Sequence, residues 1–132
     1  MQLKTESGRP SAVVDFEQVR DALSSLNEEQ GGFVILEDGE RLIQTAFDGS
    51  GLVVEKCEGS EAPLYRANRN GSPKFALADV EAMFQSWFAR SSMPSGLQWS
   101  VEEEGGTPRS LHWLLWALPL VGGVLVIHEL AR

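Results

Sequence analysis

Three carboxylates stand close together between positions 37 and 40 of this 132-residue chain, in the run Glu37-Asp38-Gly39-Glu40. Two neighbouring carboxylates can act as a general acid and a general base when their surroundings separate their pKa values. Asp-Gly is also a favoured two-residue hairpin turn, and turn formation alone accounts for acidic residues at these positions. We therefore interpret Glu37, Asp38 and Glu40 as surface carboxylates at a turn, and as candidate residues for binding a partner.

A second acidic run, Glu102-Glu103-Glu104, could engage a cation or a basic partner. Such a run is most often a solvated spacer, so we take these three residues as candidate partner-binding residues rather than metal ligands. The cluster Asp48-Gly49-Ser50-Gly51 is similar to the start of a calcium loop, but the alternating acidic ligands and the terminal Glu are missing. The sequence predicts a turn there and no metal site.

Other catalytic groups are scarce. The single cysteine, Cys57, cannot form a disulfide within one chain, and His112 and His128 lie at opposite ends of an apolar run. The sequence contains neither a Gly-Xaa-Ser-Xaa-Gly motif nor a Gly-rich phosphate loop with its Lys. We predict that the chain is not an enzyme and needs no cofactor, while a site using Glu37, Glu40 and Arg66 stays open.

The charge balance favours certain partners over others. The formal net charge is −8, and the only basic stretch holds Arg66, Arg69 and Lys74. This excess of negative charge opposes contact with nucleic acid and favours solubility or a basic protein partner. The sequence does not indicate an oligomeric state.

The run Leu111–Ile127 has no formal charge. As a helix, residues 111–130 would be about 30 Å long, close to the thickness of a bilayer's hydrocarbon core. Trp113, Trp116 and His128 would then lie at the membrane interfaces, where amphipathic rings gather. We predict a single-pass tail anchor in the lipid bilayer with the preceding domain in the cytoplasm; the alternative is a buried C-terminal helix of the soluble core.

The segments ahead of the anchor fall into three parts. We expect a flexible N-terminus over residues 1–12, a small acidic domain over 13–102 and a linker over 103–110. A helix is predicted for residues 16–27, where Asp15 and Gln18 have capping-box spacing and Val14 and Val19 the spacing of a hydrophobic staple. Gly31 and Gly32 are expected to end it.

A strand pattern follows. Residues 33–36 and the arm 40–47 should form a hairpin about Asp38-Gly39, with Ile43, Thr45 and Phe47 on one side and Leu42, Gln44 and Ala46 on the other. Residues 52–57 predict a third strand, and 64–67 a short fourth strand at an edge.

A second helix is predicted over residues 77–90, because Val80, Met83, Phe84, Trp87 and Phe88 have the spacing of a buried stripe. Leu97, Trp99 and Val101 alternate with polar residues as in a half-buried strand. The predicted fold class is α+β, an antiparallel meander of four to five strands with two helices on one face plus the transmembrane helix. Trp87 and Trp99 are the predicted central core residues.

The later part of the domain resembles a family of immunity proteins from bacterial polymorphic toxin systems, the first of the numbered immunity families. The residues that carry the resemblance are Val80-Glu81-Ala82-Met83-Phe84 through Phe88, Ser91-Ser92-Met93-Pro94 and Leu97-Gln98-Trp99. Phe33–Glu37 and Leu42–Ala46 also look like the paired strands of small uncharacterised bacterial α+β proteins. The chain departs from the family at Ser91-Ser92, where Thr-Gly is usual, and in its membrane anchor.

The resemblance implies a non-catalytic domain that binds and blocks a partner protein. Three hypotheses follow from the sequence. The first is a tail-anchored protein of the bacterial cytoplasmic membrane that presents an acidic protein-binding domain. The second is an immunity-type inhibitor of a basic toxin, and the third is an enzyme with an unrecognised site.

Overall fold

A single antiparallel sheet of seven strands organises the described part of the chain. The structure is a computed structural model and describes residues 1–27, 29, 31–49, 51–59 and 62–101. In chain order the elements are β1 (Gln2–Thr5), β2 (Ser11–Ala12), α1 (Phe16–Ser24), β3 (Phe33–Asp38), β4 (Arg41–Asp48), β5 (Gly51–Cys57), β6 (Leu64–Asn68), α2 (Leu77–Phe88) and β7 (Gln98–Val101). The strand order is β2-β1-β3-β4-β5-β6-β7, which confirms an α+β fold with more strands than the four to five predicted.

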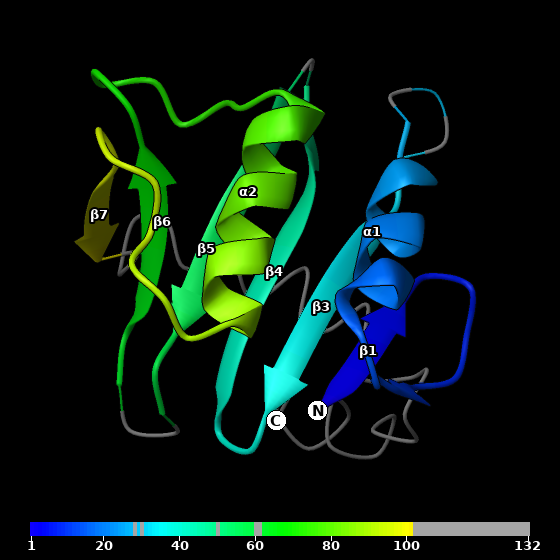
Figure 1. Cartoon of the computed structure of the whole chain (residues 1–132). Helices are drawn as coiled ribbons and strands as arrows, with labels where there is room; N and C mark the ends of the chain where they lie inside the picture. Colours follow the sequence, from blue (N-terminus) through cyan, green and yellow to red (C-terminus); the bar gives the residue numbers. More distant parts are fainter. Residues whose placement is uncertain (28, 30, 50, 60–61, 102–132) are drawn as a thin grey trace, which may run out of the picture.

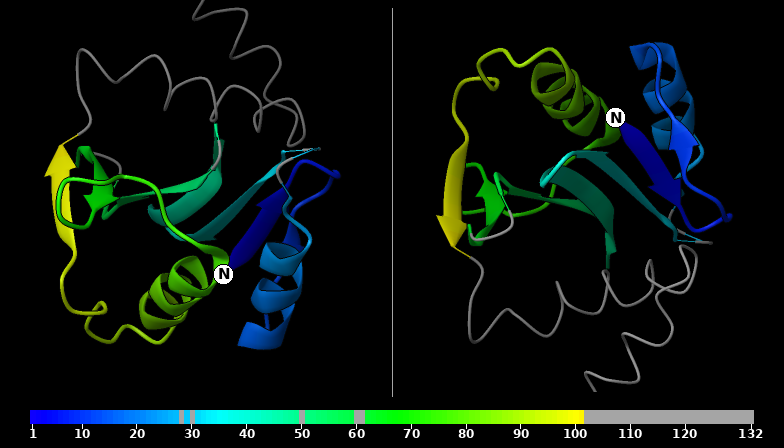
Figure 2. Two further views of the ribbon diagram at one scale, coloured as in Figure 1. Left: turned by 90° about the horizontal axis from the view of Figure 1, so that it is seen from above. Right: turned by 90° about the horizontal axis from the view of Figure 1, so that it is seen from below.

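Both helices lie on the same side of the sheet, α2 over its centre and α1 toward the β1 side (Figures 1 and 2). The main core fills the space between this helix layer and the sheet. Its largest fully buried members include Phe84, Leu23, Leu36 and Ile43. The stripe predicted for the second helix is confirmed at Val80, Met83, Phe84 and Trp87, which are buried, whereas Phe88 is only partly buried.

A capping box fixes the start of α1. The Asp15 side chain accepts a hydrogen bond from the Gln18 amide, and the Gln18 side chain accepts one from the Asp15 amide. The predicted cap is therefore confirmed, but the staple is wrong, since Val14 is 87% exposed. The helix ends at Ser24 and not near Gly31; the hydroxyls of Ser24 and Ser25 bond the carbonyl oxygens of the last turn.

Replacing Asp15 with alanine should lower the free energy of unfolding by about 1 kcal/mol, because the Gln18 amide at the helix start loses its side-chain acceptor. Urea denaturation of the full chain measures the loss. Asp21→Ala, within the same helix and away from its cap, should change stability by less than about 0.5 kcal/mol. Equal losses for the two variants would show that the capping box does not stabilise α1.

The N-terminus is part of the sheet, contrary to the flexible segment predicted for residues 1–12. β1 pairs with β3 over four residues, and Leu3 is buried in the main core. Lys4 Nζ also lies 3.0 Å from Glu37 Oε2 on β3. The sequence prediction failed because β1 is a short strand whose pairing partner lies some thirty residues further along the chain.

The hairpin of β3 and β4 is confirmed, with its turn shifted by one residue. Asp38 pairs with Arg41, so Gly39 and Glu40 form the turn rather than Asp38 and Gly39. Gly39 has φ +67°, in the left-handed region that this kind of turn requires. The predicted alternation along β4 holds: Ile43 and Phe47 pack in the main core, and Leu42 and Ala46 lie on the opposite face.

The far end of the sheet also differs from the prediction. β7 pairs with β6, so β6 is not an edge strand of the described sheet. Trp87 is a central core residue, with 2% of its surface exposed, whereas Trp99 is only partly buried against the core. The Lys56 ammonium lies 4.5 Å from the Trp99 ring centre and covers part of it.

Among the residues that the structure describes, no helix is both long and apolar enough to cross a membrane. The predicted linker 103–110 and anchor 111–130, with Trp113, Trp116 and His128, lie outside the described residues.

Candidate functional site

The carboxylates Glu37, Asp38 and Glu40 gather where the β3–β4 turn closes. Other elements bring basic side chains to them. Lys4 Nζ donates to Glu37 Oε2 at 3.0 Å, and Arg90 Nη2, just after α2, donates to Asp38 Oδ2 at 2.6 Å. Glu40 is exposed at the turn itself. We call this region, with Glu58 from the end of β5, the acidic end of the sheet.

Arg41 lies at the base of the acidic end. Its guanidinium carbon is 4.1 Å from the centre of the Trp87 ring, and its Nε donates to Glu58 Oε1 at 3.3 Å. Lys56 Nζ approaches the other Glu58 oxygen at 3.4 Å. The stacked guanidinium is therefore anchored in the core, and it fixes the position of the carboxylates around it.

Glu37 and Asp38 are consecutive residues of β3, so their side chains lie on opposite faces of the sheet, Glu37 against Lys4 and Asp38 against Arg90. Glu102, Glu103 and Glu104 lie outside the described residues. Sequence reasoning missed the basic residues Lys4, Arg41 and Arg90 that hold the cluster. No local sequence pattern could predict two of these contacts, because Lys4 is 33 residues from Glu37 and Arg90 is 52 residues from Asp38.

A second candidate surface is the face of the sheet opposite the helices, which we call the second face. Its apolar residues are Phe33, Ile35, Leu42, Ala46 and Val53. Antiparallel sheets usually keep one face polar and solvated. Here β3, β4 and β5 each contain four consecutive buried residues, so both faces of the central strands are buried.

A polar row crosses the second face. Gln44, Glu55 and Arg66 are neighbours on adjacent strands β4, β5 and β6. Gln44 Nε2 donates to Glu55 Oε1 at 2.9 Å, and Arg66 donates to Glu55 Oε2 from Nη2 at 2.7 Å and from Nε at 3.2 Å. Glu55 has no exposed surface, so these donors take the place of water around its carboxylate.

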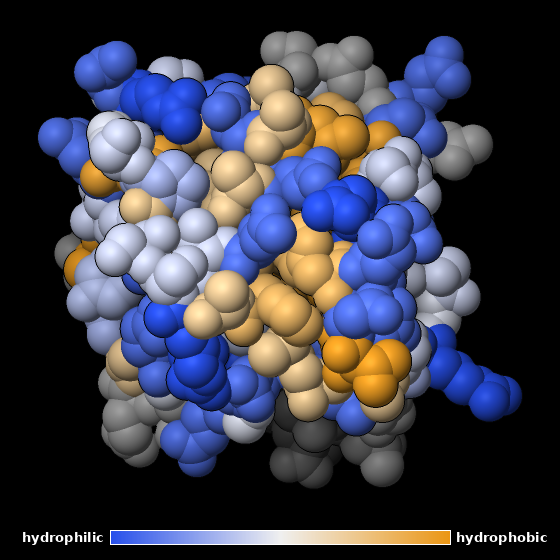
Figure 3. Space-filling model, viewed as in Figure 1, coloured by the Kyte–Doolittle hydropathy of each residue, from blue (hydrophilic) through white to orange (hydrophobic). Residues whose placement is uncertain are grey.

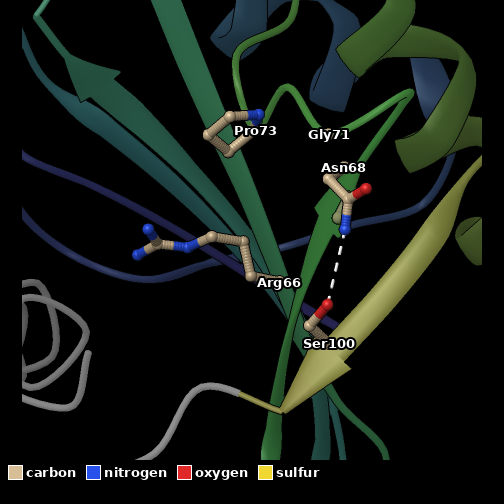
Figure 4. A pocket seen from close by; sticks show the side chains of 6 residues that line it. Arg66, Asn68, Gly71, Pro73 and Ser100 are labelled. Carbon is tan, nitrogen blue, oxygen red and sulfur yellow. Dashed lines mark hydrogen bonds between the residues drawn. The ribbon is translucent and has the colours of Figure 1, made fainter. Parts of the chain in front are cut away.

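A pocket of about 260 Å³ lies beside this row, lined by Arg66, Ala67, Asn68, Gly71, Pro73 and Ser100. Figure 4 shows the Arg66 guanidinium turned away from Asn68 and Ser100, whose side chains form a 3.4 Å hydrogen bond. Since Arg66 is paired with Glu55, the pocket offers a ligand the Asn68 and Ser100 side chains as its polar groups.

The basic side chains near position 70 each donate to an oxygen acceptor on another element. Arg69 Nη1 lies 3.4 Å from Asp79 Oδ1, and the Lys74 ammonium donates to the Asp48 carbonyl oxygen. Arg66 is also paired with Glu55, so two of these three cations lie against a carboxylate.

The helix face presents a different surface. Figure 3 shows apolar residues along the middle of this face, bordered by hydrophilic residues on both sides. Arg20 on α1 crosses to Glu81 on α2, with its Nε 2.5 Å from Glu81 Oε2. This hydrogen bond raises the pKa of the Arg20 guanidinium above its ordinary value, so Arg20 stays charged where it links the two helices.

The described residues give limited material for catalysis. No group of three or more His, Cys, Asp or Glu side chains in the described ranges could hold a metal ion. Glu37 on β3 and Arg66 on β6 are separated by two intervening strands, a distance of about 14 Å at ordinary strand spacing. The structure therefore does not bring together Glu37, Glu40 and Arg66.

Comparisons with protein-family models, with curated proteins and with solved structures found no match for this chain. The resemblance to an immunity-protein family stays a prediction that rests on the sequence.

Proposed function

We propose that this chain is a non-catalytic binding protein whose acidic end engages a basic protein partner. The observation that carries the proposal is the cluster of Glu37, Asp38, Glu40 and Glu58 at one end of the sheet, held by basic side chains from other elements. The overall charge of −8 has the same sign as this cluster. The net negative charge of the whole chain speeds encounter with a positive partner and selects against negative ones.

The geometry of the acidic end favours binding for a second reason. Carboxylates that already sit in fixed positions lose less conformational freedom when a partner docks. Glu37 and Asp38 are held by Lys4 and Arg90, and Glu58 is held by Arg41 and Lys56. Arg41 is in turn fixed over the Trp87 ring, so the cluster is attached to the rigid core.

An immunity-type inhibitor is the more specific form of this proposal, with a basic toxin as the partner. The resemblance in residues 80–99 supports it, since that segment contains most of α2 and leads through Arg90 to the acidic end. An enzyme is the weaker alternative because Arg66 lies apart from the turn that holds Glu37 and Glu40. Both forms of the binding proposal hold whether or not residues 111–130 enter a membrane.

Neutralising the turn should weaken binding. For the triple variant Glu37→Gln, Asp38→Asn, Glu40→Gln, we expect the Kd for a basic partner to rise at least about 10-fold at low salt, because three favourable charge contacts are lost. The partner to use is the purified product of a toxin gene next to the gene for this chain, in an inactivated form. The same triple variant should lose the ability to rescue growth when the two are co-expressed.

The matched control removes three negative charges elsewhere, by Glu17→Gln, Asp21→Asn and Glu29→Gln. This variant should keep its affinity within about 3-fold, and circular dichroism should show that both variants are folded. Equal weakening by the two triple variants would mean that net charge, and not the acidic end, determines binding. Unchanged affinity in the turn variant would contradict the proposal.

A further inference from the structure

We infer that the apolar segment Leu111–Ile127 packs against the second face of the sheet within the same chain. Three side chains on that face, Phe33, Ile35 and Val53, are 7%, 2% and 0% exposed. Yet both described helices lie on the other side of the sheet (Figure 2). Within the described ranges, no helix or strand lies over the second face, so a further segment must cover it.

Consecutive residues of β5 are buried on both faces of the sheet, which shows that the second face is covered. Val53 and Val54 point to opposite faces, and both have no exposed surface. Val54 belongs to the main core under the helices, and Val53 to the apolar cluster of the second face. The sheet is therefore the middle layer of three, and an uncovered second face would leave a contiguous apolar patch of the kind that soluble proteins avoid.

The sequence outside the described residues holds one segment that fits. Residues 111–127 form an uncharged run in the part of the chain that follows β7. As a helix this run would be about 25 Å long. The eight-residue strand β4 is about 27 Å long at ordinary strand rise, so one such helix matches the length of the apolar face.

The connection to the second face is long enough. β7 ends at Val101, at the edge of the sheet, and the apolar cluster lies on β3, β4 and β5. Crossing from β7 to β5 and β4 requires about 10–15 Å at ordinary strand spacing. The residues between Val101 and Leu111 can span about 30 Å when extended, so they reach the face without strain.

Charge selects this occupant over a basic partner. The charges of the polar row, Glu55 and Arg66, neutralise each other, and the residues around them are apolar. An uncharged cover leaves that pair intact, whereas a basic partner is attracted to the acidic end instead. The same segment cannot cover the sheet and span a bilayer, so the inference replaces the predicted anchor with the buried C-terminal helix that the sequence left open.

Two single-thiol variants test the inference in the full chain. In a Cys57→Ser background, Val53→Cys places a thiol on the second face, and Val54→Cys places one under the helices. Without detergent or lipid, both thiols should react with a thiol reagent at least about 100-fold more slowly than in urea. The variant Leu118→Asp, Leu120→Asp, Val126→Asp puts a charge on every side of the predicted helix. It should accelerate the reaction of the thiol at position 53 at least about 10-fold and leave the thiol at position 54 protected.

Other results would overturn the inference. Unchanged protection of both thiols in the triple aspartate variant would mean that something else covers the face. Protection of the thiol at position 53 that falls on dilution would identify a second copy of the chain as the cover. Flotation of the full chain with phosphatidylcholine–phosphatidylglycerol vesicles, with the thiol at position 53 reactive, would identify a membrane anchor. If both thiols become reactive in the triple aspartate variant, the milder variant Leu118→Ser, Leu120→Ser, Val126→Ser is used instead. The inference then requires that the thiol at position 53 reacts faster while the thiol at position 54 stays protected.

Discussion

Replacing Trp87 with alanine is expected to lower the free energy of unfolding by about 3–5 kcal/mol. Trp87 lies at the end of α2, is 2% exposed and is the largest fully buried side chain of the described core. Its loss would leave a cavity between α2 and the sheet. It would also remove the ring on which the Arg41 guanidinium stacks at 4.1 Å, and so loosen the acidic end.

Urea denaturation followed by circular dichroism measures this loss without depending on the tryptophan removed. Trp99→Ala is the matched control: Trp99 is only partly buried, so its removal should cost about 1–2 kcal/mol. A loss below about 1 kcal/mol for Trp87→Ala, or a larger loss for Trp99→Ala, would show that the packing around α2 is wrong.

Arg66→Ala is expected to cost about 3–5 kcal/mol, because it removes the cation from a fully buried carboxylate. Glu55 has no exposed surface, and Arg66 donates two hydrogen bonds to its Oε2 atom. A surface ion pair would cost less than about 1 kcal/mol when broken. The size of the loss therefore reports directly whether the second face is buried in the folded chain.

A double-mutant cycle isolates the pair. The variants are Arg66→Met, Glu55→Leu and the two together, compared by urea denaturation. The double variant should be more stable than the sum of the single losses predicts, by about 2 kcal/mol, since it leaves neither charge unpaired in an apolar setting. Additive losses would mean that Glu55 and Arg66 are solvated independently, and would contradict the buried row.

Local patterns predicted the local elements well. The capping box at Asp15, the buried stripe of α2 and the hairpin of β3 and β4 each depend on residues within a few positions of each other. The sequence missed β1, because Leu3 is buried only when β1 pairs with β3. The same limit applies to β6, whose outer neighbour β7 lies beyond α2 in the chain.

The candidate site could be predicted only in part. The turn carboxylates were visible because acidic residues and glycine favour turns. Their basic partners Lys4 and Arg90 reach the turn through the sheet register and the end of α2, which no local pattern encodes.

The second face did leave a sign in the sequence. The continuous apolar runs Phe33–Leu36 and Leu52–Val54 are typical of strands covered on both faces. Strands of this kind need a layer of structure against each face. The apolar run Leu111–Ile127 can therefore be interpreted as such a layer as well as a membrane span. Hydropathy alone cannot distinguish a membrane span from a buried core helix.

The most direct test of the three-layer arrangement is a nuclear Overhauser experiment on the full chain in buffer without detergent. We expect cross-peaks from the indole rings of Trp113 and Trp116, or from neighbouring leucine methyl groups, to the methyl groups of Ile35 and Val53. Cross-peaks to Val54 should be absent, because that residue faces the helices. A folded chain in which Ile35 and Val53 show no contact with residues 111–127 would contradict the account.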